Sequence, residues 1–232
     1  MKPEITKECI KTLFDSPFIR VLDLQYAPGK HYYDATRRSP EDILAIKSKE
    51  EFQNTLPDAV SCIVILCDRD ENEQIYGEPK LLLSYEFRYP AGRFLLSPPA
   101  GLIDKADCVA YEKSDAPLLR TAAREIKEET GLTVEESDTL FVVNPFLFST
   151  PGMTDESNGI VCATLYNKDI SSLTTSGAVG SECFDGFELV DLTTARELLA
   201  RGTDKNGIYY SIYTWVVLMY FVSGMWQNQK GN

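Results

Sequence analysis

The sequence predicts an α/β (α+β) fold, and three observations support this class. Apolar runs of strand length recur along the chain, an amphipathic segment lies near its middle, and an apolar segment lies near its end. Turn-forming residues between the strands favour hairpins. With 232 residues the chain is long enough for a well-buried core with extensions. We expect an amino-terminal extension over residues 1–57 and a main domain over residues 58–232.

The amino-terminal extension is predicted to contain a β-hairpin. Residues 1–20 have a mixed pattern that we interpret as helical. Apolar residues alternate over 19–26, a turn follows, and 31–38 forms the returning strand. Residues 40–57 are polar and form a connector, with a short helix expected from about residue 40 to residue 46 or beyond.

The main domain is predicted to alternate strands with helices. Strands are expected at 58–68, 80–89, 139–148, 160–166 and 187–192, with a helix at 194–201. Residues 207–226 carry no charge over 20 positions, which is the length of a membrane span. Because this segment is rich in Tyr, Ser and Thr and has no basic cluster beside it, we favour a core or dimer-interface helix over a membrane anchor.

The amphipathic segment near the middle of the chain is predicted to be a helix. Its apolar residues recur at helical spacings: Leu118, Leu119, Ala122 and Ile126. Asp115 and Pro117 are typical of a helix start, and Gly131 is typical of a helix stop.

Three carboxylates share one face of this helix. Glu125, Glu128 and Glu129 lie three or four positions apart or side by side, so their like charges repel. Clustered oxygen ligands suit a hard divalent cation such as Mg²⁺ or Mn²⁺, which substrate phosphates often bind as well. The chain has a single histidine, so sites built on several histidines are excluded and the chemistry rests on carboxylates.

The same stretch resembles a known motif. Residues 124–132, REIKEETGL, match the R-E-x-x-E-E-x-G-x core of the Nudix box. Residues 99–104, PAGLID, resemble the segment that opens this box in ADP-ribose pyrophosphatases. The resemblance implies the Nudix α/β/α sandwich around a mixed β-sheet, with an amino-terminal hairpin extension and a closing apolar helix.

Two features depart from the usual box. Between Gly101 and Arg124 lie 22 residues, an insertion of about nine. The acidic residue normally eight positions before the arginine is replaced by Ala116, and Glu112 or Asp115 could stand in for it. Outside the box, Ser97 stands where the family often has a glutamate, which leaves the number of bound metals open.

The resemblance also implies roles for box residues. The backbone carbonyl of Ala100 and the carboxylates of Glu125 and Glu129 are expected to bind the metal. Glu128 is expected to complete or tune that shell, and Arg124 to hold a box glutamate in place.

A general base is expected from the loop that precedes the last strand. In the ADP-ribose pyrophosphatase-like subfamily a glutamate of this loop has that role, and here Glu182 and Asp185 compete for it, with a slight preference for Glu182. Gly177, Gly180 and Gly186 would let the loop close over a bound substrate.

The resemblance extends to substrate-binding residues. The segment with Tyr33, Asp34 and Arg38 is similar to the family hairpin in which an aromatic ring stacks on adenine. An ordinary hairpin with a surface tyrosine is the alternative. Arg88, in a segment similar to F-R-x-P, is expected to contact phosphate, and Glu156, in a loop similar to S-S-P-G-x-S-D-E, to bind substrate or orient the metal shell.

These features predict metal-dependent hydrolysis of a pyrophosphate bond in a nucleoside diphosphate derivative. ADP-ribose, cleaved to AMP and ribose 5-phosphate, is the favoured substrate, with another nucleoside diphosphate sugar or a dinucleotide as alternatives. A non-catalytic nucleotide sensor and a membrane-attached or partner-binding protein are the rival classes.

The composition bounds the partners and the setting. The net charge of −12 and the lack of a basic tract argue against duplex nucleic acid as a partner. Six cysteines without CxxC spacing and an amino terminus unlike a signal peptide predict a reduced, cytoplasmic protein. In the family the hairpin crosses a dimer interface, so the resemblance also implies a homodimer.

Overall fold

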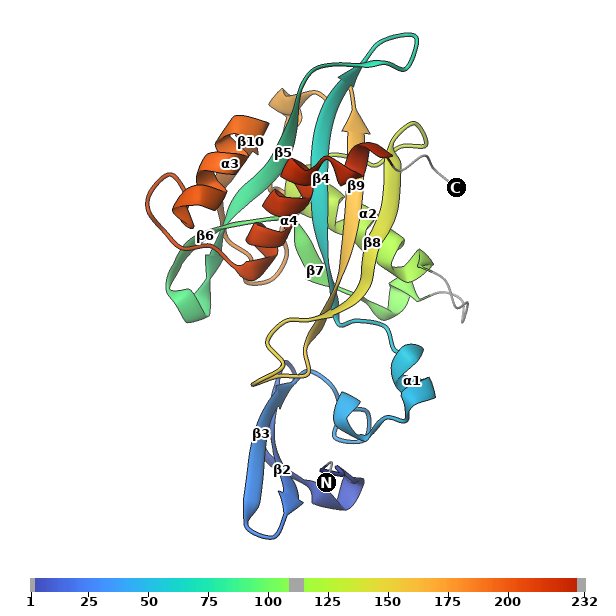
Figure 1. Ribbon diagram of the computed structural model, residues 1–232, viewed down its shortest axis with the longest axis vertical. Helices are drawn as coiled ribbons and strands as arrows, with labels where there is room; N and C mark the ends of the chain where they lie inside the picture. The colour runs from blue at the N-terminus through green and yellow to red at the C-terminus, as the bar shows by residue number, and fades with distance from the viewer. Residues whose placement is uncertain (1–2, 109–114, 229–232) are drawn as a thin grey trace. The chain divides into compact units, whose positions relative to one another are not determined.

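The computed structural model describes residues 3–108 and 115–228, and the chain divides into two compact units (Figure 1). We call the first the hairpin unit, which comprises residues 1–59 and 145–159. The second, the sheet unit, comprises residues 60–144 and 160–232.

The hairpin unit contains a three-stranded antiparallel sheet in the order β1-β2-β3. Its strands are β1 (Ile10–Asp15), β2 (Arg20–Ala27) and β3 (Lys30–Thr36). The predicted hairpin is therefore present. The helix expected over residues 1–20 is wrong, since only Lys7–Cys9 form a 3₁₀ turn before β1. Ile10 pairs with Leu24 and packs against the buried cluster of Leu22, Leu24 and Ile43, a tertiary contact that overrides the local pattern.

The connector after β3 forms its helix later than expected. Leu44–Ile46 is a 3₁₀ turn, and α1 spans Lys49–Gln53. The start of α1 is set by a capping box, in which Glu51 N donates to Ser48 Oγ (3.2 Å) and Ser48 N donates to Glu51 Oε2 (2.8 Å). The Ser-x-x-Glu pattern was the signal for this boundary.

A seven-stranded sheet forms the centre of the sheet unit. Its strands are β4 (Ala59–Arg69), β5 (Ile75–Arg88), β6 (Arg93–Ser97), β7 (Ala100–Leu102), β8 (Thr139–Phe148), β9 (Ser157–Tyr166) and β10 (Phe184–Val190). The order is β10-β5-β4-β9-β8, with β6 paired to β5 and β7 paired to β4. β4 and β5 are antiparallel, while β4 and β9 run in the same direction (Figure 1), so the sheet is mixed as predicted.

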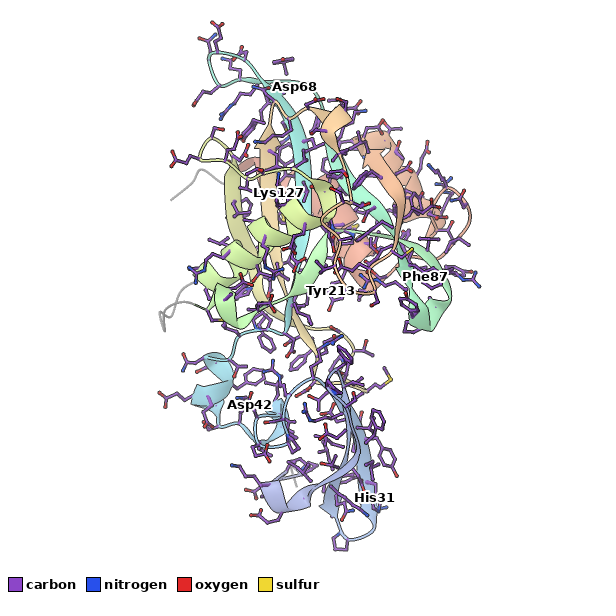
Figure 2. All side chains as sticks on the ribbon, turned by 180° about the vertical axis from the view of Figure 1, so that it is seen from behind. His31, Asp42, Asp68, Phe87, Lys127 and Tyr213 are labelled. Atoms are coloured by element: carbon purple, nitrogen blue, oxygen red, sulfur yellow. The ribbon has the colours of Figure 1, made fainter. Side chains whose placement is uncertain are left out.

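Helices cover both faces of this sheet. They are α2 (Ala116–Thr130), α3 (Leu192–Arg201) and α4 (Ile212–Ser223). α4 lies in front of the sheet in Figure 1, and α2, which carries the labelled Lys127, lies in front when the molecule is turned by 180° in Figure 2. The predicted α/β/α sandwich is therefore confirmed.

The two helices that matter most begin and end where local chemistry requires. α2 ends at Gly131, which adopts a left-handed conformation with φ 78°. α4 begins after Ser211, whose side chain caps Thr214 N, and the Thr214 hydroxyl donates to Leu96 O of β6 at 2.6 Å. Of the helices in the described residues, none has both the length and the apolar character needed to cross a membrane.

Candidate active site

Two buried carboxylates of α2 face the short strand β7. Ala100 N donates to Glu129 Oε2 at 3.2 Å. A Cβ atom added at Gly101 would lie 1.8 Å from Glu125 Oε1, so a side chain at this position would displace the carboxylate. The Pro-Ala-Gly segment and the box helix therefore pack directly against each other, with Glu125 and Glu129 at their junction.

Arg124 ties the acids of this region together. Its Nη1 donates to Glu125 Oε1 (2.7 Å) and to Glu128 Oε2 (3.1 Å). Its Nη2 donates to Leu102 O (2.9 Å) and to Asp107 Oδ2 (3.0 Å). Because a guanidinium is planar and rigid, these four hydrogen bonds fix the orientation of the Arg124 guanidinium through both of its terminal nitrogens.

The sequence did not identify Asp107 as part of this region. It lies in a 3₁₀ turn, Lys105–Asp107, within the box insertion, 17 positions before Arg124. Burial is the largest single effect and would raise the pKa of the Asp107 carboxyl, but the hydrogen bonds from Arg124, Asp104 N and Thr121 and the charge of Arg124 together outweigh it, and the pKa lies below its usual value. The insertion lengthens the segment between Asp107 and Arg124, so counting back from Arg124 missed this residue, although it stands six positions after Gly101, as the acid of the usual box does.

Of the two acids proposed to stand in at the box position of Ala116, only Asp115 lies in the described residues. Asp115 is exposed at the start of α2, where its backbone carbonyl accepts from Leu119 N. Glu112 falls outside the described residues.

Burial raises the pKa of both α2 carboxyls that face β7. The pKa of Glu125 rises to about 7 through burial, although Arg124 opposes the shift. The pKa of Glu129 rises to about 9, first through burial and then through the charges of Glu86 and Glu125. Two buried acids that repel each other carry an electrostatic cost that a bound cation would relieve.

Glu86 on β5 is a second acid that the sequence did not single out. Its side chain is buried, and Arg88 Nη2 lies 2.5 Å from Glu86 Oε2. Burial raises the pKa of Glu86, with Arg88 opposing and Glu182 adding to the shift. Ser97, at the position where the family often has a glutamate, is buried and its hydroxyl donates to Leu95 O at 3.3 Å. Alternation along β5 gave no reason to expect a buried acid at position 86.

Arg88, the residue expected to contact phosphate, ends β5 and is about half exposed. Its ion pair with Glu86 holds the guanidinium on the same side of the strand as that acid. The rest of its donors remain available to an anion, because a guanidinium has five N–H groups.

The loop before β10 places the two candidate bases differently. Its backbone is held on both sides of Glu182, because Tyr89 Oη, in the turn after β5, donates to Ser181 O (3.2 Å) and Phe87 N of β5 donates to Cys183 O (2.8 Å). The charge of Glu182 contributes to the raised pKa values of Glu86, Glu125 and Glu129, so Glu182 lies within electrostatic range of these acids.

Asp185 lies in other surroundings. It is exposed and lines a cavity of about 450 Å³ together with Tyr85, Arg93 and Lys205. The acids of α2 are not among the residues that line this cavity.

Part of this loop packs on α2. A Cβ atom at Gly177 would lie 2.6 Å from Glu128 O, and Thr174 N donates to Thr130 O at 3.1 Å. Gly180 and Gly186 have positive φ angles of 63° and 84°. The loop is therefore held by the carboxyl end of α2, Gly180 permits the turn before Glu182, and Gly186 lies in β10 where the register shifts between Phe184 and Phe187.

The remaining predicted substrate residues belong to the hairpin unit. Tyr33 on β3 is 59% exposed, as a stacking ring must be. Asp34 is buried, and its Oδ1 accepts from Asp155 N at 3.0 Å. Burial, followed by the charge of Asp155, raises the pKa of Asp34 to about 6.

Two arginines of the hairpin unit differ in their surroundings. The side chain of Arg38 is 10% exposed and forms ion pairs with Asp58 (2.9 Å) and Asp155 (3.8 Å). Arg37 is 43% exposed and its Nε lies 3.2 Å from Glu156 Oε1. Arg38, which was expected to bind substrate, thus forms its ion pairs inside the hairpin unit. Glu156 forms an ion pair with Arg37.

The donor set near α2 fits a divalent cation that the protein shares with its substrate. Among residues 3–108 and 115–228, no three His, Cys, Asp or Glu side chains form a ready-made metal cage. Mg²⁺ is usually bound by only one or two carboxylates, with water and substrate phosphates completing its octahedral shell. Glu125 and Glu129, buried and mutually repelling, supply such a pair.

Two curated proteins are related to the chain in sequence. An uncharacterized Nudix hydrolase of Schizosaccharomyces pombe is 34% identical over 111 residues, which are 47% of this chain and 43% of that protein. A Caenorhabditis elegans protein named as nudix hydrolase 2 is 33% identical over 85 residues, which are 37% of this chain and 33% of that protein. The matches thus span less than half the length of either curated relative.

The fold is also that of a solved structure. The crystal structure of an ADP compounds hydrolase aligns with a TM-score of 0.53 and 17% identity, covering 99% of this chain and 98% of that one. At this identity the likeness shows a shared fold. No protein-family model matches the chain.

Proposed function

We propose that this chain is a Nudix protein and that it hydrolyses the pyrophosphate bond of a nucleoside diphosphate derivative. The box core on α2, the α/β/α fold and the Nudix relatives in sequence support this proposal. The observation that carries the proposal is the junction of β7 and α2. There, two buried carboxylates with raised pKa values meet the Pro-Ala-Gly backbone.

Glu125 and Glu129 are proposed to bind a divalent cation, Mg²⁺ or Mn²⁺, together with the carbonyl of Ala100. Such a cation neutralises the diphosphate and lowers the pKa of a water molecule. Glu128 accepts a hydrogen bond from Arg124 and is proposed to tune the ligand shell of the cation. Arg124 also donates to Glu125 and keeps that carboxylate oriented.

Glu182 is proposed as the general base. Its loop is held by Phe87 of β5 and by Tyr89 of the turn that follows β5, and its charge acts on the same acids that would hold the cation. The carboxylate accepts a proton from water as the water oxygen bonds to one phosphorus and the bridging P–O bond breaks. Asp185, which lines a separate cavity, is not assigned this role.

The favoured substrate is ADP-ribose, cleaved to AMP and ribose 5-phosphate. The exposed ring of Tyr33 supports a stacking contact with a base, and the partly exposed Arg88 supports a contact with phosphate. Asp34 and Arg38 are proposed to hold the strand that presents Tyr33, because Asp34 is buried and accepts a hydrogen bond from Asp155 N, and Arg38 is buried in an ion pair with Asp58. The homodimer implied by the family hairpin remains part of this proposal.

A panel of diphosphates tests the proposal. Purified protein is given ADP-ribose, UDP-sugars, GDP-mannose, NADH and diadenosine polyphosphates with Mg²⁺ or Mn²⁺. Phosphatase then releases phosphate from monophosphate products, and an EDTA sample is the control. We expect metal-dependent cleavage with ADP-ribose as the best substrate. If only another diphosphate is cleaved, the proposed contact of Tyr33 with adenine is wrong. If nothing is cleaved but a ligand raises the melting temperature, a nucleotide sensor is favoured.

A further inference from the structure

The glycine at position 177 lies against the backbone of α2. A Cβ atom added at Gly177 would lie 2.6 Å from Glu128 O, 2.8 Å from Glu128 Cα and 3.1 Å from the Glu128 carbonyl carbon. Gly177 is not among the glycines with positive φ, so close approach, and not backbone conformation, requires a glycine here. A side chain would collide with main-chain atoms, which no change of rotamer can move aside.

The same loop is hydrogen-bonded to the end of α2. Thr174 N donates to Thr130 O at 3.1 Å, and so satisfies one of the carbonyls that a helix leaves without an internal partner at its carboxyl end. A Cβ atom at Gly131, the residue after the helix, would lie 2.7 Å from Thr174 Cγ2. Contacts at Thr174 and at Gly177 thus attach the loop to the last turn of α2.

Local hydrogen bonds connect this attachment to Glu182. Ala178 N donates to Thr175 O at 3.0 Å. Glu182 N donates to Val179 O (3.2 Å), and Val179 N donates to Glu182 Oε2 (2.8 Å). The carboxylate of Glu182 is therefore held by the backbone of its own loop. Because these turns follow Gly177 directly, a shift of the loop at Gly177 displaces the carboxylate as well.

The helix is the fixed partner in this contact. Its inward residues Leu118, Ala122 and Ile126 are 2% exposed or less, whereas Thr174 and Ser176 of the loop are exposed. A close-packed core resists displacement more than an exposed loop does. A side chain at position 177 would therefore move the loop away from α2, and the helix would keep its place.

We propose that Gly177 is a positioning residue, whose contact with the backbone of Glu128 holds the loop of Glu182 on α2 before substrate binds. The general base is then already in place at the box helix, and closure of the loop over the substrate does not bring it there. Such placement matters because a displacement of about 1 Å can lower a rate about a hundredfold. This inference rests on the proposed function, since it concerns the same base.

Steady-state kinetics of Gly177→Ala on ADP-ribose with saturating Mg²⁺ tests the proposal. We expect kcat to fall about tenfold to a hundredfold, because the base is displaced. KM should change by less than about twofold, because the substrate contacts lie elsewhere. The matched control is Ser176→Ala in the same loop. Ser176 is exposed and donates through its backbone N to Thr174 Oγ1 (3.1 Å), a bond that alanine keeps, so kcat should be unchanged.

Mn²⁺ binding without substrate shows whether the helix has stayed in place. Titration followed through electron paramagnetic resonance should give Gly177→Ala an affinity within about twofold of the wild type, because the cation ligands on α2 do not move. Wild-type kcat in Gly177→Ala would overturn the proposal. A loss of Mn²⁺ affinity as large as the loss of kcat would overturn it as well, since α2 would then have moved.

A double variant separates positioning of the base from a general effect on structure. In Glu182→Gln, the further change Gly177→Ala should lower kcat by less than about twofold, because the base that Gly177 positions is already absent. Losses that multiply would contradict the proposal.

If Gly177→Ala does not fold, amide hydrogen exchange of the wild-type protein without substrate, followed by NMR, decides the question. The amide of Thr174 should exchange slowly, as its hydrogen bond to Thr130 O requires. Exchange as fast as that of a solvent-exposed amide would show that the loop is not held on α2 before substrate binds.

The outcomes also distinguish this inference from the proposed function. A wild-type protein that cleaves no diphosphate would overturn both, and wild-type kcat in Glu182→Gln would overturn the base that Gly177 is proposed to position. A wild-type protein that cleaves a diphosphate and loses kcat in Glu182→Gln, with Gly177→Ala equal to it in kcat, would overturn the role of Gly177 alone.

Discussion

The carboxylate of Glu125 occupies the space in which a side chain at Gly101 would lie. A Cβ atom there would be 1.8 Å from Glu125 Oε1 and 2.0 Å from the carboxyl carbon. The glycine of the Pro-Ala-Gly segment is therefore required by close approach, and its φ is not in the left-handed region. This contact links the opening of the box to the helix that we propose binds the metal.

Gly101→Ala should therefore displace Glu125 and lower cation affinity at least about tenfold. Mn²⁺ titration of the purified variant measures this effect. Gly152→Ala is the matched control, because a Cβ at Gly152 meets nothing within 4 Å. Equal affinity in Gly101→Ala and the wild type would show that Glu125 does not need its present position.

Replacing each candidate base by its amide should lower turnover strongly for Glu182 and little for Asp185. Glu182→Gln is expected to lower kcat by about 10²–10⁴, the usual contribution of a general base. Asp185→Asn should leave kcat nearly unchanged, because Asp185 lines a cavity apart from the box acids. Steady-state kinetics with saturating metal gives both values, and the reverse order would move the base to Asp185.

Arg38 is expected to contribute to stability far more than its neighbour. Arg38→Ala leaves Asp58 and Asp155 without their cation and should lower the free energy of unfolding by about 3–5 kcal/mol. Arg37→Ala removes a largely exposed pair with Glu156 and should cost about 1 kcal/mol or less. Urea denaturation measures both. A stable Arg38→Ala variant with a raised KM would instead indicate that Arg38 serves the substrate.

Asp34 should make stability depend on pH. Its pKa is about 6 in the folded protein, against an ordinary value of 3.8, so the folded state holds a proton that the unfolded state releases between these values. The contribution of Asp34 to stability therefore rises as pH falls through 6 and is complete below about 3.8.

The matched variant for this prediction is Asp34→Asn, which retains an oxygen to accept from Asp155 N. It should melt at a higher temperature than the wild type at pH 8, and the difference should shrink by pH 4.5. Thermal unfolding followed by circular dichroism at the two pH values is the measurement. A difference that grows toward low pH would contradict the raised pKa.

The sequence predicted those parts of the fold that local chemistry determines. The start of α2 at Ala116 and its stop at Gly131 follow from proline, glycine and apolar spacing, and the acids of the helix follow from its period. β1 was missed because its pairing with β2, Ile10 opposite Leu24, is a tertiary contact. Residues 145–159 join the hairpin unit through contacts such as Ala35 N to Met153 O at 3.0 Å, which no local pattern reveals.

The site was predicted where a motif has fixed spacing and missed where it does not. Asp107 was missed because the acid was counted back from Arg124 across the longer segment, and Glu86 comes from a strand whose alternation predicts only which face a side chain occupies. Glu86 comes near enough to Glu129 of α2 for its charge to raise the pKa of that acid. Spacing along the chain carries no information about such contacts.

Turnover of ADP-ribose by wild type and Glu129→Gln, with Mg²⁺ at pH 7.5, tests the central claim most directly. Glu129 is buried and its pKa is raised to about 9, so a neutral glutamine should not lower the melting temperature, while it removes a cation ligand. Glu136→Gln, at an exposed glutamate beyond α2, is the control. We expect turnover to be lost in Glu129→Gln alone with the fold intact. Near-normal kinetics in that variant would contradict the assignment of the metal site.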